Sequence, residues 1–331
     1  MVTRRQAIAA GATLLVSPYA RPQPRSRILK VGLLNGGADS EDTQANLAGM
    51  AQRLAGLGYV EGRSITWERR FAGGEYSRLP ALAEELIRMR PDLILVSGGT
   101  ATDVMRQATS TIPLVMIVAA DPLKSGWVKS LARPGGNLTG ITQTSGDAGL
   151  KRAELLLEIA PQTRRIGVFM NPDNPTFRTA APTTSGPVEA FARARNTELL
   201  RFELSSASDI VPTFTEMAAR GVGALIVPPD SFFAKQHARI ATLALERHWP
   251  SVGGLLSYAT RGGLAAHGAN YPELYRQAAV YIDKIARGAK PGDIPIAQAD
   301  IQEVWINRRT AGALSLVIPE VVLLRATRVV D

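Results

Sequence analysis

Small and polar residues stand where several apolar runs of this chain end, and their types suit the binding of a small polar ligand. The run "LILVSGGT" ends in Ser97, Gly98, Gly99 and Thr100. If a strand here leads directly into a helix, the free backbone N–H groups of the first helical turn favour an anion such as a carboxylate. Asp121, at the end of the next apolar run, has the charge to pair with an ammonium group.

The second half of the chain offers a comparable set of strand-end residues. The stretch "NPDNP" supplies two asparagine amides that can both donate and accept hydrogen bonds. An aspartate follows "VGALIVPP", and a phenylalanine shortly after it could cover a planar ligand. Since ligands of open parallel sheets bind beyond the carboxyl ends of the strands, these positions are candidates. The predicted ligand-binding residues are Asn35, Ser97, Gly98, Gly99, Thr100, Asp121, Asn171, Asn174, Asp230 and Phe232.

Most of these residues also have a purely structural interpretation. Thr100 with Asp103 fits a capping box, although a cap uses only some of the free N–H groups. Asp121 fits a turn-capping role equally well, and the two asparagines fit an Asn-Pro turn. Phe232 at the start of a helix is more often a core residue. If "SGGT" takes a carboxylate and Asp121 or Asp230 takes an ammonium group, the ligand is an amino acid or a similar zwitterion.

Strands, loops and helices alternate along the chain in two series. The first series has the apolar runs "ILKVGLLNGG", "PDLILVSGG" and "IPLVMIVAADP". Helical segments are predicted to follow them at 42–56, 100–109 and 123–132. The second series begins beyond Pro161 with "RRIGVFMNPDNP", "VGALIVPPD" and "WPSVGGLLS". Continuous apolar strands between helices indicate an α/β protein of two doubly wound, Rossmann-like lobes with parallel sheets.

Three short segments are predicted to join the two lobes as a hinge. They are "PGGNLTGITQT", "GGLAAHG" and "EVWINRR". The glycine pair of the first segment follows a helix and precedes a strand, whereas a phosphate cradle needs glycines between a strand and a helix. We therefore interpret it as a linker. The predicted first lobe is 28–140 plus 268–298, and the second is 141–267 plus 299–331.

Residues 1–27 have the layout of an export signal and a linker. Arg4 and Arg5 precede a short apolar run, Ala7 to Val16, which favours the twin-arginine route and a periplasmic location. The run is too short for a stable membrane span, although retention as an uncleaved anchor is left open. Removing the five arginines of this segment reduces the net charge from +9 to +4. The remaining basic residues are scattered, so the composition gives no support to nucleic-acid binding.

The composition and motifs argue against an enzyme, a metal site or a cofactor. The chain has no cysteine, and it lacks the G-x-S-x-G, P-loop and H-E-x-x-H patterns. His237 and His248 are eleven residues apart on one predicted helix, about three turns, so they cannot share a metal and are predicted to be surface residues.

Further upstream, Pro182 and Pro187 interrupt a helical pattern, so a helix is predicted to start near Gly186.

Several ordered stretches together resemble the ABC transporter substrate-binding protein family that includes tryptophan- and tyrosine-binding members. They are "LGYVEGRSI", "RLPALAEEL", "STIPLV", "SLARPGGNLTGI", "NPDNP", "YRQAAVYIDKIARGAKPGDIPI" and "INRRTAGALSLVIP". The resemblance runs from Ile28 to the C-terminus. It implies a type I periplasmic-binding fold in which two lobes, joined by three crossings, close around a ligand.

The resemblance implies an extracytoplasmic receptor of an ABC importer, and the residues above favour an amino acid or related carboxylate as its ligand. Its partners would be that small molecule and an ABC permease in the inner membrane, and we expect a monomer. The alternative is a periplasmic sensing module of the same fold that signals to a membrane sensor.

Overall fold

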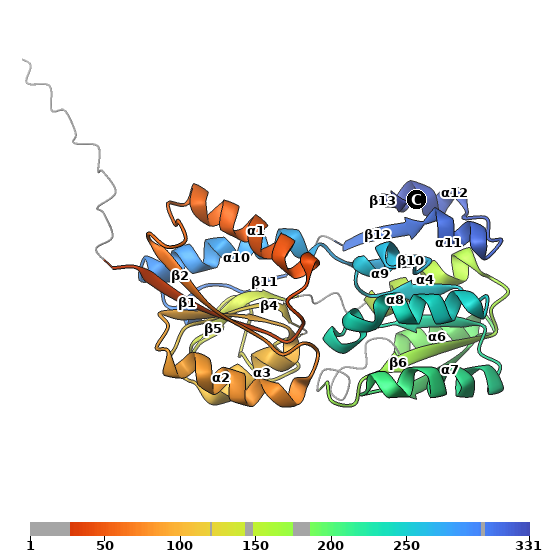
Figure 1. The fold of residues 1–331 in the computed structure, drawn as a ribbon, viewed down its shortest axis with the longest axis horizontal. Coiled ribbons are helices and arrows are strands. Elements are labelled where there is room, and N and C mark those ends of the chain that lie inside the picture. Colours follow the sequence, from red (N-terminus) through yellow and green to blue (C-terminus); the bar gives the residue numbers. More distant parts are fainter. Residues whose placement is uncertain (1–26, 120, 143–147, 175–185, 299–301) are drawn as a thin grey trace, which may run out of the picture.

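The computed structural model describes residues 27–119, 121–142, 148–174, 186–298 and 302–331. In these residues the chain forms two α/β lobes that lie side by side, each built on its own sheet (Figure 1). The predicted doubly wound, two-lobed fold is confirmed. The predicted export signal lies outside the described residues, apart from Arg27 at its end.

The first lobe is built on a six-stranded sheet whose strands all run parallel. In spatial order the strands are β11 (Ala297–Gln298), β5 (Leu138–Thr142), β4 (Leu114–Ala119), β3 (Leu93–Ser97), β1 (Leu29–Asn35) and β2 (Ile65–Phe71). The strand order reverses at β1, which pairs with β2 on one side and β3 on the other. Crevices for ligands form at such a reversal, beyond the carboxyl ends of the strands.

Helices cover both faces of this sheet because its strands are apolar on both faces. Leu33 of β1 packs into a core with α1 and α10, and its neighbour Leu34 packs into a second core with α2 and α3 on the opposite face. Figure 1 shows α1 and α10 above the sheet and α2 and α3 below it. The helices are α1 (Glu41–Gly56), α2 (Leu79–Arg88), α3 (Gly99–Ala108) and α10 (Tyr271–Ala286), with single 3₁₀ turns at Tyr76–Arg78 and Pro291–Asp293.

The second lobe has a seven-stranded sheet that is parallel except where β12 runs antiparallel to β10. In spatial order the strands are β13 (Arg328–Val330), β12 (Gln302–Asn307), β10 (Ala265–Ala269), β9 (Ser251–Gly253), β8 (Ala224–Val227), β6 (Arg165–Met170) and β7 (Glu198–Glu203). Here the order reverses at β6, between β7 and β8. The second lobe therefore has its own crevice beyond β6 and β8.

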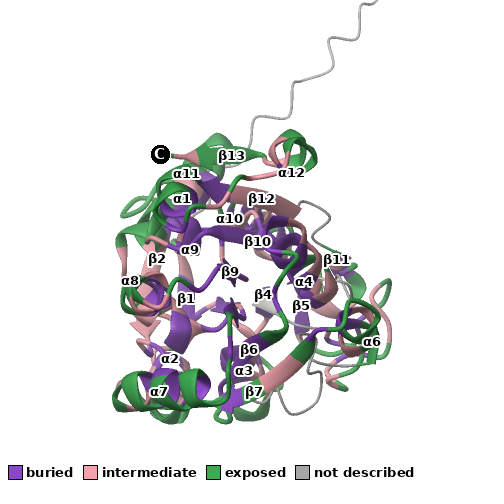
Figure 2. Ribbon diagram, turned by 90° about the vertical axis from the view of Figure 1, so that its right-hand side faces the viewer, coloured by how far each residue is buried: buried purple, intermediate pink, exposed green. Residues whose placement is uncertain are grey.

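Two helical layers enclose the second sheet. Its helices are α4 (Ala148–Ile159), α6 (Gly186–Ala194), α7 (Ile210–Ala219), α8 (Ser231–Glu246), α9 (Ser257–Thr260), α11 (Arg308–Ala313) and α12 (Glu320–Arg325), with a 3₁₀ turn at Ala207–Asp209. One core joins α7, α8 and α9 to the sheet, and another joins α4, α6, α11 and α12 to it. Figure 2 shows the burial in the strands and the exposure on the outer faces of helices such as α7.

The chain passes between the two sheets three times, as predicted. The passages lie between Thr142 of β5 and Ala148 of α4, at Asn270 between β10 and α10, and between Gln298 of β11 and Gln302 of β12. Two of the three predicted segments are not themselves crossings, because most of "GGLAAHG" is β10 and most of "EVWINRR" is β12, both within the second sheet. Gly135 and Gly136 form a left-handed turn, both with φ of +69°, before β5. They do not line the cavity described below.

Two expectations about helices have different outcomes. The helix expected at 123–132 is wrong, because these residues form consecutive turns and Gly126, in their middle, has a φ of +66° that no right-handed helix contains. The helix expected near Gly186 is confirmed, since α6 begins there and Pro187 occupies its first turn. Proline is tolerated at that position because the first turn has no intrahelical acceptor for its missing N–H.

Candidate functional site

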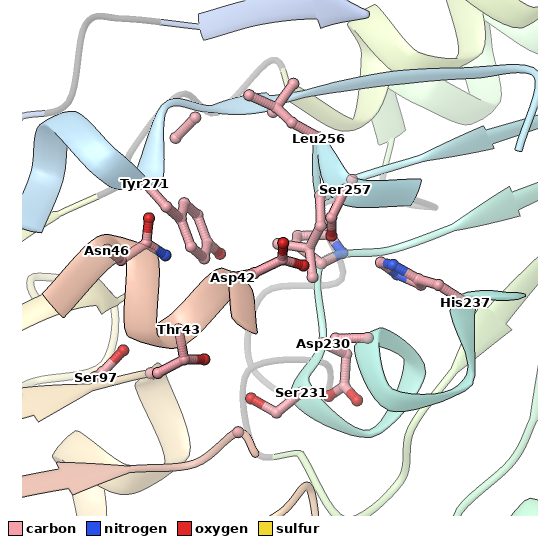
Figure 3. Close-up of a pocket in the computed structure, with 18 of the residues that line it drawn as sticks. Asp42, Thr43, Asn46, Ser97, Asp230, Ser231, His237, Leu256, Ser257 and Tyr271 are labelled. Carbon is pink, nitrogen blue, oxygen red and sulfur yellow. The ribbon is translucent and has the colours of Figure 1, made fainter. Parts of the chain in front are cut away.

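A cavity of about 670 Å³ lies between the lobes and is lined by both of them. Its walls include the carboxyl ends of β1 and β3 and the first turns of α1, α3, α8 and α10. Figure 3 shows Asp42, Thr43 and Tyr271 of the first lobe facing Ser231 and His237 of the second. A cavity of this size matches the range in which proteins bind small molecules.

The start of α3 supplies backbone donors to the cavity. Gly98, with a φ of +104°, is the N-cap of α3 and turns the chain sharply from β3 into the helix. The first hydrogen bond at this end of the helix runs from Thr102 N to Gly98 O, 3.0 Å. The N–H groups of Gly99, Thr100 and Ala101 precede it and have no acceptor within the helix. All four residues from Gly98 to Ala101 line the cavity, so this turn offers an anion both donors and a favourable helix dipole.

The capping box expected at Thr100 and Asp103 is wrong. Thr100 Oγ1 instead donates across the cleft to Asn174 Oδ1 at 3.2 Å. Asp103 Oδ1 accepts from Trp127 Nε1 at 3.0 Å. No side chain caps α3, because its N-cap is Gly98 and Thr100 lies inside the first turn, so the first N–H groups are not competed for in that way.

Polar side chains at the ends of β1 and β3 form a buried cluster on the floor of the cavity. Asn35 and Ser97 pair in register across the two strands, and both line the cavity. Tyr275 of α10 donates to Ser97 Oγ at 3.0 Å and accepts from Asn35 Nδ2 at 3.4 Å. Burial raises the pKa of Tyr275 to about 12, so its phenol is protonated at physiological pH.

The carboxylate of Asp230, on the cavity wall, accepts five hydrogen bonds from described residues. Its Oδ1 caps α8, accepting from the backbone of Phe232 at 2.8 Å and Phe233 at 3.3 Å, and from Asn171 Nδ2 at 3.2 Å. Its Oδ2 accepts from Asn174 Nδ2 at 2.7 Å and from the phenol of Tyr76, in the first lobe, at 2.8 Å. Five donors exceed the four lone-pair positions of a carboxylate, so Asp230 has no capacity left for an ammonium group.

Seven of the ten predicted residues line the cavity, namely Asn35, Ser97, Gly98, Gly99, Thr100, Asn174 and Asp230. The other three lie outside its lining. Asp121 caps a turn by accepting from Leu123 N at 2.9 Å and Lys124 N at 3.2 Å. Asn171 is 1% exposed and orients Asp230. Phe232 is a core residue packed against Phe233, so it does not cover the cavity.

The prediction that His237 and His248 are surface residues holds only for His248. His237 is 2% exposed, lines the cavity and packs edge-on against Tyr258 at 5.1 Å between ring centroids. Burial, with a smaller effect of the Arg261 charge, lowers its pKa to about 3, so the ring is neutral at physiological pH. Among the described residues, no three His, Cys, Asp or Glu side chains are placed to hold a metal.

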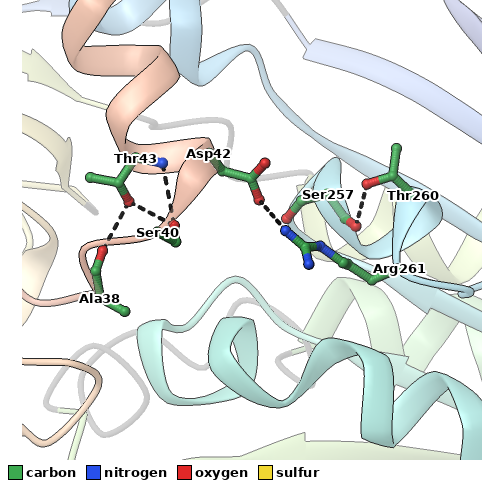
Figure 4. Close-up of polar contacts among 7 residues, drawn as sticks. All are labelled: Ala38, Ser40, Asp42, Thr43, Ser257, Thr260 and Arg261. Carbon is green, nitrogen blue, oxygen red and sulfur yellow. Dashed lines mark hydrogen bonds and ion pairs between the residues drawn. The ribbon is translucent and has the colours of Figure 1, made fainter.

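An ion pair closes the cleft at the side of α1. Asp42, in the first turn of α1, lies 3.7 Å from Arg261, which follows α9 in the other lobe (Figure 4). Ser40 caps the same turn through Thr43 N at 3.3 Å, which holds the start of α1 at the cavity. Both charged side chains are about half exposed, so water screens their attraction.

The aromatic and basic side chains of the cavity were not predicted. The aromatic lining residues are Tyr76, Tyr271, Tyr275 and Trp305, and the basic ones are Arg152 of α4, Lys235, Arg261 and Arg328. Arg152 had a readable signal: it shares the buried face of its helix with Gly149, Ala153 and Leu156, where a charged residue is costly. The tyrosines gave none, because aromatic residues at helix starts are usually core residues.

Known proteins share both the sequence pattern and the fold. The family model "ABC transporter substrate binding protein" matches residues 38–330. A tyrosine-binding protein of Clostridioides difficile (strain R20291) is 26% identical over 269 residues, which is 81% of this chain and 76% of that protein.

Two solved structures match 92% of this chain, and the match extends over the whole length of each of them. A conserved domain protein from Vibrio cholerae has a TM-score of 0.83 and 25% identity. An ABC domain from Streptococcus pneumonia in complex with L-Trp has a TM-score of 0.81 and 24% identity.

None of the described helices is long and apolar enough to cross a membrane. The matched family consists of substrate-binding receptors and not enzymes. With the family model covering most of its length, this chain belongs to the ABC transporter substrate-binding protein family.

Proposed function

We propose that this protein is the extracytoplasmic solute receptor of an ABC importer and that it closes its lobes on a small carboxylate with a planar, apolar body. The observation that carries the proposal is the cavity between the lobes, to which each lobe contributes strand ends and helix starts. A ligand that contacts both lobes favours the closed arrangement, because its binding free energy is larger there.

The lining supports this ligand chemistry. The free N–H groups of α3 suit a carboxylate, and Ser97, Asn35 and Asn174 add polar contacts. Tyr271 and Trp305 supply flat apolar surfaces, and Figure 3 shows the Tyr271 ring directed into the cavity. A relative named for tyrosine and a structural relative solved with L-Trp make aromatic acids the first compounds to test.

The location and the partner follow from the proposed role. We propose that residues 1–27 direct export by the twin-arginine route, that the protein works as a monomer in the periplasm, and that its closed form docks on an ABC permease. Deletion of the gene should abolish uptake of the labelled ligand by intact cells. Normal uptake combined with a lost transcriptional response to the ligand would instead favour the sensing alternative.

A thermal-unfolding screen tests the receptor function directly. The protein is unfolded and refolded to remove any carried-over ligand, then melted with aromatic and aliphatic amino acids, aromatic acids, sugars and purines. A ligand at a hundred times its dissociation constant adds about 2.7 kcal/mol to the unfolding free energy, which gives a clear rise in melting temperature. If no compound raises the melting temperature of a well-folded sample, the proposal is contradicted.

A further inference from the structure

Arg152 is a buried cation that lines the cavity without a counter-ion among the described residues. It is 2% exposed and lies on α4, next to the passage between the lobes. Its one side-chain hydrogen bond within the described part of the chain runs from Nη1 to the His267 carbonyl at 3.4 Å. Its Nε has no hydrogen-bond partner there. A guanidinium has five N–H donors, so most of its capacity is unused.

This arrangement is unfavourable for a charged side chain. Taking a charge out of water is costly unless a partner of opposite charge and hydrogen bonds replace the water. Burial lowers the pKa of Arg152 to about 10, which still leaves it protonated at pH 7. Burial is the main cause that lowers the pKa of the adjacent His267 to about 4, and the charge of Arg152 adds to it. The ring beside Arg152 is therefore neutral at pH 7 and offers it no compensating charge.

The acidic side chains of the described cavity lining do not compensate this charge. They are Asp42 and Asp230. Asp42 pairs with Arg261 and is half exposed, and both oxygens of Asp230 are occupied by five donors. Asp230 therefore has no free lone pair for a ligand ammonium group, Asp42 already faces the Arg261 guanidinium, and Asp121 lies outside the lining. Both lining carboxylates have partners, whereas the buried Arg152 has no counter-ion among the described residues.

We propose that Arg152 binds the acidic group of the ligand, and that the ligand class is an organic acid for which an α-ammonium group adds nothing to affinity. The inference rests on the receptor function proposed above and deepens it. The planar fork of Arg152 matches the two oxygens of a carboxylate. Since α3 of the first lobe also attracts anions, an acid is drawn to both walls of the cavity.

Matched compounds separate the two charges of an amino acid. L-tyrosine, 3-(4-hydroxyphenyl)propionate and tyramine share a phenol, and L-tryptophan, indole-3-propionate and tryptamine share an indole. Calorimetric titration of the full chain at pH 7.5 should give the acid an affinity within about threefold of the amino acid, since the lost ammonium group had no partner. The amine, which lacks the carboxylate, should bind at least about a hundredfold more weakly.

The variant Arg152→Met removes the charge but keeps an unbranched apolar stem. It should weaken binding of the acids about a hundredfold. Lys151→Met is the matched control, because Lys151 is the next residue of α4, is exposed and pairs with Glu154 outside the cavity lining. It removes one positive charge from the same helix and should leave the affinity unchanged.

Melting of the ligand-free proteins provides a second, independent readout. If Arg152 serves the ligand, Arg152→Met melts at the same or a higher temperature than the wild type, because an uncompensated buried charge has been removed. A markedly lower melting temperature would show that Arg152 is structural and would overturn the inference.

The remaining outcomes distinguish the inference from the function beneath it. Binding of the amines, or unchanged acid binding by Arg152→Met, overturns the inference alone. A wild type that binds only uncharged compounds overturns the inference and the carboxylate ligand proposed above, but leaves the receptor function standing. If the wild type binds nothing in the wider screen of amino acids, acids, sugars and purines, the receptor function fails, and the inference fails with it.

Discussion

Tyr76 links the two lobes through a single phenol group. Its hydroxyl donates to Asp230 Oδ2 at 2.8 Å and accepts from Ser231 N at 3.2 Å, both in the second lobe. Burial, together with the charge and hydrogen bond of Asp230, raises the pKa of Tyr76 well above its usual value. The phenol is therefore a permanent donor at physiological pH, and both bonds exist only while the lobes are together.

Tyr76→Phe should favour the open arrangement. A hydrogen bond to a charged group contributes about 1.5–3 kcal/mol, so ligand affinity should fall by roughly tenfold to a hundredfold in a calorimetric titration. X-ray scattering of the ligand-free variant should give a larger radius of gyration than the wild type. Tyr59→Phe is the control, because the Tyr59 hydroxyl donates to Asp283 Oδ1 within the first lobe at 2.9 Å. Equal effects of the two substitutions would show that the interlobe bond has no special role.

His237 should make the protein less stable as the pH falls. Its pKa is lowered from 6.5 to about 3 in the folded protein by burial and by Arg261. Between these values the unfolded chain binds a proton that the folded one does not, so stability present above pH 6.5 is lost on acidification. From pH 7 to pH 5 the loss due to His237 is about 2 kcal/mol.

Urea unfolding at the two pH values tests this effect. His237→Gln should lose about 2 kcal/mol less than the wild type over the same interval. The buried His267, whose pKa is also lowered, contributes equally to both proteins and cancels in the comparison. The exposed His248 serves as the control through His248→Asn, which suits its positive φ of 55°. An unchanged pH dependence in His237→Gln would contradict the assignment.

At the residue scale the sequence predicted the polar part of the cavity better than its aromatic part. Strand ends meet at one edge of a parallel sheet, so Asn35 and Ser97 could be placed from chain order alone. Tyr76 and Tyr271 reach the cavity only because the lobes come together, a long-range arrangement that no local pattern encodes. Phe232 was wrongly predicted to bind the ligand, because its position near a strand end did not reveal that its side chain points into the core.

The loop after β2 touches the start of α8 in the other lobe. At Gly74, with a φ of +81°, an added Cβ would lie 2.9 Å from Phe232 Cα and 3.0 Å from Ser231 O. These are backbone atoms at the N-terminus of a helix, so they cannot move aside as a flexible side chain would. The glycine lets two elements of different lobes approach closely.

Gly74→Ala should therefore block closure. Ligand affinity should fall at least about tenfold, since the bound state needs the contact that the methyl group prevents. Gly73→Ala is a matched control: Gly73 also has a positive φ of 69°, but its added Cβ meets only the end of Arg78 at 3.8 Å. Both variants should lose about 1–2 kcal/mol of stability from backbone strain, measured by urea unfolding. Equal affinities of the two variants would contradict the prediction.

Elements with a long apolar run were predictable, and those defined by tertiary contact were not. β3 and β8 are short, almost entirely apolar runs that lie between helices, which is the pattern of a buried parallel strand. Residues 123–132 carry spaced apolar side chains as a helix does, yet Trp127 reaches back to Asp103 and the segment folds as turns. The expected cap of α3 is also absent, because the helix begins one residue earlier than Thr100 and has Gly98 as its N-cap.

At the scale of the whole molecule, the two lobes can be locked together without disturbing their cores. The chain has no cysteine of its own. A Cβ built on Gly36 of the first lobe lies 3.5 Å from Ser231 Oγ of the second, so two cysteines at these positions could form a disulfide after a small shift of the side chains. The double variant Gly36→Cys with Ser231→Cys therefore carries a single possible intramolecular bridge.

Oxidation of this double variant in the absence of ligand should slow the binding of ligand to the purified protein at least about tenfold, because the ligand can enter the cavity only when the lobes separate. Stopped-flow tryptophan fluorescence would measure the rate, and reduction with dithiothreitol should restore it. Each single-cysteine variant, treated with the same oxidant, should bind at the reduced rate. Equal rates of ligand binding by the oxidised and reduced double variant would show that the ligand enters without opening of the lobes.

The shortest passage between the lobes consists of one residue, Asn270, between β10 and α10. Its Oδ1 accepts from Glu273 N at 3.0 Å to cap α10, and the residue also lines the cavity. Because one residue joins the two lobes here, they can separate least at this passage, and a ligand in the cavity would lie beside it. In the receptor proposed above, a thicker ligand would therefore hold the far ends of the lobes at a wider angle. The shape of the closed protein would then depend on the thickness of its ligand.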